Sequence, residues 1–316
     1  MSIASKITVQ CSVCNTSEMT LFGCYSDRRK GLTGSWDIVE CSNCGVLMLD
    51  PSPSAAQLSE YYSVYSKNKH INFSLGLGAK YPLLRKAFHW LSGDIDPRDF
   101  IQVAVGSRVL DYGCGQAGCL IDFDAQGIKI SGAEIDADVV AACQKQGIDV
   151  RQVENIDQIP FENDIFDVVY LMQVFEHLRN PHGFMAELAR VLKNDGVLYL
   201  AVPNFDSIWR KVFAKNWVSG WFAPFHLFHY NRDSLTTLAN QHGFDVIESW
   251  SRTPESWLRL NLKAIFYPKE NQLDWHTSWL DQRVIRYLLM CMLRIIELPF
   301  RERDCLVIKL IKRETK

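Results

Sequence analysis

The stretch Val109-Leu110-Asp111-Tyr112-Gly113-Cys114-Gly115-Gln116-Ala117-Gly118 decides how this chain folds. It is a short apolar run that ends near a carboxylate and continues into a Gly-x-Gly-x-x-Gly turn. Residues 130–136 are typical of a second strand that ends in an acid, Glu134. A strand, a glycine turn, a helix and an acid after the next strand indicate one nucleotide-binding half of an α/β sheet. We therefore expect the glycines to let a ligand approach the backbone, and Glu134 to accept hydrogen bonds from ribose hydroxyls.

Asp111 narrows the class of ligand. It lies two residues before the first glycine, where we expect it to face whatever lies over the turn. A fixed carboxylate repels a pyrophosphate, but it attracts a ligand that carries an ammonium and a sulfonium group. The stretch resembles motif I of the class I methyltransferases, which use S-adenosylmethionine (SAM). A dinucleotide site is the alternative interpretation of the same glycines.

Two Cys-x-x-Cys pairs near the N-terminus predict a metal site. Cys11 and Cys14 form the first pair, and Cys41 and Cys44 form the second. Four thiolates suit tetrahedral Zn²⁺, and the flanking residues alternate in polarity like short strands. We expect a module like a zinc ribbon over residues 1–50 that holds a structural zinc ion. Four reduced cysteines without a metal are the alternative, and a redox pair is disfavoured because neither pair opens a βαβ unit.

Beyond residue 105, apolar runs alternate with helical patterns, which predicts a mostly parallel sheet with helices on both faces. Asp136, Asn180 and Asn231 mark positions where helices begin. The expected strands are residues 108–111, 129–133, 149–153, 166–171, 197–202, 244–250 and 305–311.

The domain organisation follows from this pattern. Helices expected at residues 55–66 and 79–92 precede the sheet, so we interpret residues 51–100 as a helical lead-in that covers the cofactor pocket. Residues 101–316 then form the main domain, with a helical insertion at about residues 251–303, before the last strand.

Several motifs in order resemble a class I SAM-dependent methyltransferase over residues 105–250, about half of the chain. Besides the glycine turn and Glu134, they include Glu154-Asn155 before Ile159-Pro160-Phe161, and Phe175-Glu176-His177-Leu178. The resemblance implies a Rossmann-like sheet of seven strands and SAM as cofactor. Asn155 stands where the family often carries an aspartate near the adenine, and its amide can still meet that edge. The implied cofactor-binding residues are Asp111, Gly113, Cys114, Gly115, Gly118, Glu134, Ile135, Asn155 and Gln173.

Three histidines are candidates for the base that methyl transfer needs when the acceptor must lose a proton. His177 follows the fourth strand beside Glu176, which suits an acid/base group, a weak metal site or structural packing. His226 and His229 lie in an aromatic loop that either covers the acceptor as a stacking wall or closes the core as a plug. The aromatic residues of this loop are Trp217, Trp221, Phe222, Phe225, Phe228 and Tyr230.

Residues 284–300 are nearly apolar all round, broken by Arg286, Arg294 and Glu297. Such a helix is usually buried, so we expect a core or homodimer contact. An interfacial helix that reaches a lipid-linked substrate is the alternative, and the basic residues that follow favour it.

Composition sets few further limits on partners and location. The 316 residues are 47% hydrophobic and carry a formal net charge of −2, which gives no global indication of nucleic-acid binding. No apolar run reaches the ~18 residues of a membrane span, and a signal-peptide core is missing. The ten cysteines do not resemble a secreted disulfide framework. We expect a cytoplasmic protein, with membrane association left open.

The leading hypothesis is therefore a zinc-containing methyltransferase with a small-molecule or sugar-type acceptor. The N-terminal module and His226-Leu227-Phe228-His229-Tyr230 resemble enzymes of surface-polysaccharide and sugar-modifying pathways. An enzyme that modifies RNA or protein is a second hypothesis, although residues 28–30 are only a small basic cluster. A non-catalytic binding protein with this fold is a third.

Overall fold

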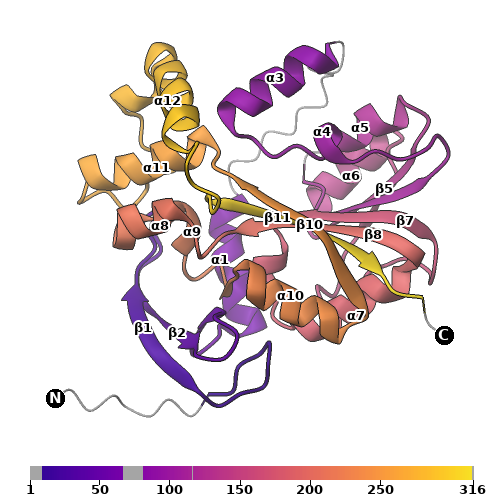
Figure 1. Cartoon of the computed structure of the whole chain (residues 1–316), viewed down its shortest axis with the longest axis horizontal. Helices are drawn as coiled ribbons and strands as arrows, with labels where there is room; N and C mark the ends of the chain where they lie inside the picture. Colours follow the sequence, from indigo (N-terminus) through magenta and orange to yellow (C-terminus); the bar gives the residue numbers. More distant parts are fainter. Residues whose placement is uncertain (1–8, 67–80, 116, 315–316) are drawn as a thin grey trace.

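The computed structural model describes residues 9–66, 81–115 and 117–314. Figure 1 shows a central twisted sheet with helices packed around it, and a smaller strand-rich part near the N-terminus. The central sheet consists of β4 (Arg108–Tyr112), β5 (Lys129–Glu134), β6 (Val150–Gln152), β7 (Phe166–Met172), β8 (Leu192–Pro203), β10 (Phe244–Arg252) and β11 (Cys305–Lys312).

The order of strands in this sheet is β10-β11-β8-β7-β4-β5-β6. The strands from β8 to β6 in this order are parallel to their neighbours, whereas β11 is antiparallel to both β8 and β10. The predicted Rossmann-like, mostly parallel sheet of seven strands is confirmed. Residue 116, within the glycine motif, and residues 79–80 of the predicted second helix lie outside the described residues.

Two cores cover the two faces of the sheet, because neighbouring residues of a strand point to opposite sides. Leu110 of β4 packs with the core that contains α7 and α10, and Val109 packs with the core that contains α5 and α6. The helices around the sheet are α4 (Pro97–Phe100), α5 (Gly118–Asp124), α6 (Ala137–Lys145), α7 (Pro181–Val191) and α10 (Arg232–Gln241).

Three of these helices begin where the sequence predicts. The Asp136 side chain accepts a hydrogen bond from the Asp138 N–H at 3.1 Å, and the Asn180 side chain accepts one from the Gly183 N–H at 2.9 Å. Asn231 begins α10 in a reciprocal capping box with Ser234. These bonds satisfy backbone donors that a helix start otherwise leaves without partners.

The N-terminal strands do not form a separate sheet of their own. They are β1 (Met19–Tyr25), β2 (Trp36–Cys41) and β3 (Leu47–Leu49), and β9 (Phe228–His229) continues the sheet beside β3. Leu47 pairs with His229, and Met48 pairs with Phe228. The cysteine module and the aromatic loop of the main domain therefore share one sheet.

In the described residues, two helices lie before α4 and the central sheet, and a helical insertion separates the last two strands of the sheet. The leading helices are α1 (Ala55–Ser66) and α3 (Pro82–Ser92), and the insertion contains α11 (Glu255–Phe266) and α12 (Arg283–Ile296). Shorter elements are η1 (Phe175–His177), α8 (Ile208–Phe213), η2 (Ala214–Asn216), α9 (Val218–Trp221) and η3 (Trp279–Asp281).

Residues 284–300 are predicted to contact the core or a second copy of the chain, and within the single chain one side of α12 contacts the core. Leu289, Met290 and Leu293 are buried, but Val284 is 70% exposed and Leu288 is 61% exposed. Within the described part of the chain, none of the helices combines the length and the apolar character needed to cross a bilayer.

Candidate cofactor and acceptor site

The glycine turn follows β4 at the carboxyl edge of the parallel strands, where ligands bind in folds of this class. The Gly113 N–H donates to the Ala133 carbonyl at 2.8 Å, which ties the turn to β5. Gly113 has φ +80°, and a Cβ atom there would lie 2.4 Å from Cγ2 of Val174. Both the backbone conformation and the close approach require glycine at this position.

The other glycines of the turn face open space. A Cβ atom built on Gly115 or Gly118 meets no heavy atom of the described residues within 4 Å. Beside this space, the Glu134 carboxylate accepts hydrogen bonds from the N–H groups of Gly115 at 2.9 Å and Ile135 at 2.8 Å. A fixed carboxylate next to a bare backbone turn suits a ligand with hydroxyl groups.

Asp111 is buried beneath this turn, with 6% of its surface exposed. Burial raises the pKa of its carboxyl to about 7; the Tyr170 hydroxyl lowers that pKa, and the negative charge of Glu134 raises it further. A cation bound nearby would favour the ionised form of Asp111. The donor set therefore fits a cofactor with hydroxyl groups and positive charge, such as SAM.

The remaining predicted cofactor residues come just after β4, β5, β6 and β7, at the carboxyl edge of the parallel strands. Ile135 is 57% exposed just after Glu134, and Cys114 is partly buried in the glycine turn. Asn155 is exposed after β6, and its side-chain oxygen accepts a hydrogen bond from the Asp157 N–H at 3.1 Å. Gln173 follows β7 and donates to the sulfur of Cys305 at 3.2 Å.

A cluster of titratable side chains lies just beyond the end of β7. The ligand atoms that Glu176, His177 and His226 offer lie within 4.8 Å of one another. Nε2 of His226 is 3.8 Å from Oε1 of Glu176, and its Nδ1 contacts the Gly220 carbonyl at 2.7 Å. The structure thus brings together two histidines that are far apart in the sequence.

Hydrogen bonds fix the orientation of both rings. Nδ1 of His177 is 2.8 Å from the Phe225 carbonyl and 3.1 Å from the Tyr62 hydroxyl. Because a carbonyl only accepts, Nδ1 of each histidine carries the proton, which leaves Nε2 as the proton acceptor. The ring centroids of His177 and His226 are 4.8 Å apart, and those of His226 and His229 are 6.3 Å apart.

Burial dominates the titration of this cluster. It raises the pKa of Glu176 to about 8, and neither carboxyl oxygen has a hydrogen-bond partner among the described residues. It lowers the pKa of His177 to about 4 and that of His229 to about 3, and it holds the pKa of His226 well below its usual value. Near neutral pH the three imidazoles are therefore neutral, and Glu176 is largely protonated.

The aromatic loop packs as a plug rather than as an open wall. The six aromatic side chains of this loop are at most 6% exposed: Trp217, Trp221, Phe222, Phe225, Phe228 and Tyr230. Trp221 and Phe222 also line a pocket of about 360 Å³, together with Tyr25, Arg29 and Lys215 among others. The Phe222 ring, which lines this pocket, lies 5.2 Å from the His226 ring.

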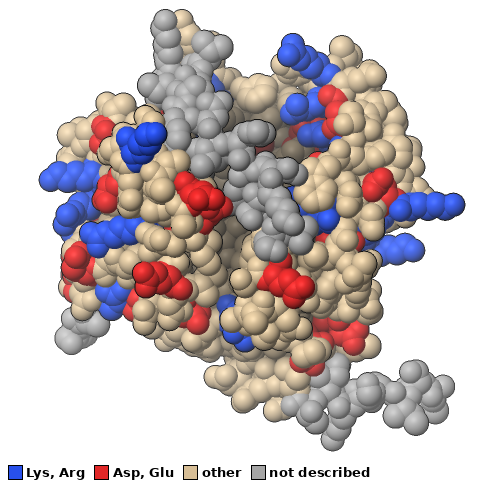
Figure 2. All heavy atoms as spheres, turned by 180° about the vertical axis from the view of Figure 1, so that it is seen from behind, with Lys and Arg blue, Asp and Glu red and all other residues tan. Residues whose placement is uncertain are grey.

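The small basic cluster is engaged within the protein. Arg29 and Lys30 both pair with Asp274, at 3.0 and 2.9 Å. Arg28 donates to backbone carbonyls near the end of α11, including that of Tyr267 at 2.8 Å. On the face that Figure 2 shows, Lys and Arg side chains are interspersed with Asp and Glu side chains. Neither observation supports an RNA-binding arm.

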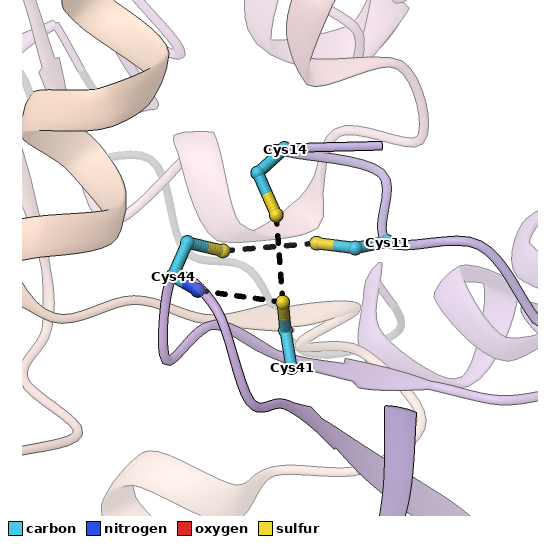
Figure 3. A group of neighbouring side chains, drawn as sticks. All are labelled: Cys11, Cys14, Cys41 and Cys44. Atoms are coloured by element: carbon cyan, nitrogen blue, oxygen red, sulfur yellow. Dashed lines mark hydrogen bonds between the residues drawn. The ribbon is translucent and has the colours of Figure 1, made fainter. Parts of the chain in front are cut away.

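The four N-terminal cysteines point toward one centre (Figure 3). The sulfur atoms of Cys11 and Cys44 are 3.7 Å apart, those of Cys14 and Cys41 are 3.5 Å apart, and all four lie within 4.8 Å of one another. Sulfur atoms about 2.3 Å from a central tetrahedral Zn²⁺ would be about 3.8 Å apart. The Cys44 N–H also donates to the sulfur of Cys41 at 3.4 Å. The donor set therefore fits a tetrahedral metal.

Comparison with known proteins gives the family. A methyltransferase domain family matches residues 85–249, just over half of the chain. The chain belongs to this family. The glycine turn, Asp111 and Glu134 are the residues that predict this family from the sequence.

Relatives of this chain carry names from different pathways. The chain is 32% identical to the ubiquinone biosynthesis O-methyltransferase of Maricaulis maris, over 39% of the chain and 52% of that protein. It is 33% identical to the sterol 24-C-methyltransferase erg6 of Schizosaccharomyces pombe, over 29% of the chain and 26% of that protein. Among solved structures, the [4+2]-cyclase SpnF is similar, with a TM-score of 0.47 and 17% identity over 84% of the chain and 98% of that chain. The chain thus spans about half of the first relative and a quarter of the second.

Proposed function

We propose that this methyltransferase transfers a methyl group to a polar small molecule of sugar type, and that the Glu176, His177 and His226 cluster manages the proton released by the acceptor. The observation that carries the proposal is the pair of neutral, oriented imidazoles beside a buried, unpartnered carboxyl group. Such a cluster is costly to bury, so a function for it is the simplest reason for its presence.

We assign the cofactor to the open space over the glycine turn. Gly115 and Gly118 would contact it through their backbone, Glu134 would accept from its ribose hydroxyls, and Asp111 would balance its positive charge. The predicted contacts of Cys114, Ile135, Asn155 and Gln173 belong to the same proposal. When bound, SAM supplies an electrophilic methyl group on a sulfonium, whose carbon–sulfur bond breaks with the electron pair moving to sulfur.

The contribution of the chain is to orient the acceptor and to accept its proton. Nε2 of His226 is the acceptor atom that we assign, because its tautomer is fixed and Glu176 lies 3.8 Å away. His177, which is partly exposed, would lie nearer to the entering molecule. The side chain of His229 is 1% exposed, and we assign it a supporting role in the loop.

The pocket beside Phe222 supports a polar ring as the acceptor. Tyr25 and Trp221 stack with centroids 4.2 Å apart, and Arg29 lies 3.9 Å from the Phe222 centroid. Aromatic rings beside a cation such as Lys215 suit a hydroxylated ring that carries an anionic group better than a wholly apolar one. A sugar linked to polysaccharide synthesis meets this description.

We further propose that the four cysteines hold one structural Zn²⁺ ion. Four thiolates close the coordination sphere, so the ion would have no open position for substrate. Its role would be to stabilise the module that carries β3.

Transfer of a deuterated methyl group from labelled SAM tests the acceptor class. Nucleotide-linked sugars, oligosaccharides, catechols, bulk RNA and peptides are offered separately, and mass spectrometry locates the label. We expect label on a sugar, and a His226→Gln variant should lose about 100-fold or more in turnover while binding SAM normally. His242→Gln, at the end of α10, is the matched control and should keep full turnover. Label on RNA or protein would instead support the second hypothesis.

A further inference from the structure

The outer surface of α12 is largely apolar, and two of its three arginines pair with buried glutamates. Val284, Leu288 and Ile295 are 70%, 61% and 67% exposed. In contrast, Arg294 pairs with the buried Glu297 at 3.2 Å, and Arg286 pairs with a buried glutamate of α11 at 3.4 Å. A helix on the surface of a soluble protein normally has the opposite arrangement.

Helix α3 shows the same inversion. Leu83, Leu84 and Trp90 are 82%, 69% and 58% exposed. Its polar residues Arg85 and His89 instead face Asp99 of α4, at 3.3 and 2.7 Å. The apolar spacing of this helix therefore marks its outer side and not a contact with the core.

The two inverted helices lie together at one end of the molecule (Figure 1) and pack against each other. The contact is close at the end of α3, where a Cβ atom on Gly93 would lie 2.8 Å from the guanidinium of Arg294. We define the α3–α12 face by Leu83, Leu84, Trp90, Val284, Leu288 and Ile295. Exposed apolar surface on two neighbouring helices is typical of an interaction site in soluble proteins.

The exposed charged side chains near this face are positive, which favours an anionic partner. The exposed charged residues of α3, α12 and the turn that follows α12 are Lys86, Arg283 and Arg301, and each is a cation. The acidic Glu297, which follows α12, is buried with 1% of its surface exposed, so it adds no negative charge to this face. A second copy packed on the same face would bring like charges together, whereas a bilayer with anionic lipids offers apolar depth and opposite charge at once.

We propose that the α3–α12 face docks this protein onto the surface of an anionic lipid membrane. Helix α12 has 14 residues, which is too short to span a bilayer, so it lies in the interface. Trp90 and Tyr287 are exposed on the two helices, and such side chains favour the boundary between headgroups and acyl chains.

Co-sedimentation with vesicles tests this proposal. The full-length protein is mixed with phosphatidylcholine vesicles, with or without phosphatidylserine. We expect binding to the anionic vesicles that weakens with salt, and at least about tenfold weaker binding without phosphatidylserine, because each cation near the surface contributes about fivefold. Absence of binding to the anionic vesicles would overturn the proposal.

Two variants with matched exposure locate the contact. Leu288→Glu/Ile295→Glu alters the face at outward positions that should not disturb folding, and we expect it to abolish sedimentation. Val105→Glu/Val212→Glu changes residues 81% and 61% exposed elsewhere, and it should bind like the unaltered protein. Equal binding of both variants would overturn the proposal. Light scattering is the second readout: a dimer that Leu288→Glu/Ile295→Glu dissociates would identify a second copy as the occupant and also overturn it.

Discussion

Replacing Gly118 with alanine should separate the cofactor-binding role of the glycine turn from its structural role. Gly118 is the first residue of α5, and its backbone lies outside the left-handed region that favours glycine. A Cβ atom there meets no described atom within 4 Å. Alanine is also favoured over glycine in helices by about 0.5–1 kcal/mol. The variant should therefore be as stable as the original protein, or more stable by up to about 1 kcal/mol.

The same methyl group should weaken cofactor binding. If SAM lies over the turn, the new Cβ atom occupies part of its space, and inserting a methyl group into a packed contact costs about 1–3 kcal/mol. That range corresponds to a dissociation constant about 5-fold to about 150-fold higher. Stability and affinity should thus change in opposite directions, which general damage to the fold cannot produce.

Calorimetric titration with SAM and urea unfolding of the free protein measure the two quantities. Gly147→Ala is the control, because Gly147 has φ +76° at the end of α6 and also has no described neighbour within 4 Å of a Cβ atom. It should lose about 1–2 kcal/mol of stability through backbone strain and keep its affinity for SAM. If Gly118→Ala binds SAM as tightly as the original protein, the cofactor does not approach this glycine and our assignment of the turn is refuted.

Three further predictions concern ionisable groups and the metal. Ionisation of Asp111 should make SAM binding tighten as pH rises through about 7, and titration of Asp111→Asn should show weaker binding without this rise. Because the folded state raises the pKa of Glu176 from 4.5 to about 8, the free energy of unfolding should fall by a few kcal/mol as pH rises from 4.5 to 8. Urea unfolding of Glu176→Gln over the same pH range should lack this fall, and an equal fall in the variant would contradict the prediction. Elemental analysis should find one zinc per chain, and Cys44→Ser should lower the melting temperature by about 10 °C, as expected for the loss of several kcal/mol.

The local features of the fold were predictable from the sequence because they depend on neighbouring residues. The glycine turn after β4 and the helix starts at Asp136, Asn180 and Asn231 each need only a short segment. The meeting of His177 with His226 was not predictable, since it depends on how the aromatic loop returns to the end of β7. The sequence supplied both histidines as candidates but gave no distance between them.

Helix α3 shows a different limit of sequence reasoning. Leu83, Leu84 and Phe88 recur at helical spacing and are exposed together on one side of α3. Periodicity does not say whether that side faces the core or the solvent. Here Arg85 and His89 pair with Asp99, so the polar side faces inward. These contacts are made to another helix, so the local spacing of apolar residues does not report them.

The cysteine module and the proposed acceptor site are mechanically connected. Cys41 ends β2, Cys44 lies in the turn before β3, and β3 pairs with β9 through Leu47 and His229. The Leu49 N–H also donates to the carbonyl of Leu227, one residue after His226. In the described residues, the glycine turn is instead held to β5 by the hydrogen bond from the Gly113 N–H to the Ala133 carbonyl. Disturbing the cysteines should therefore displace the acceptor loop before it affects cofactor binding, which gives the proposed zinc ion a role in holding that loop.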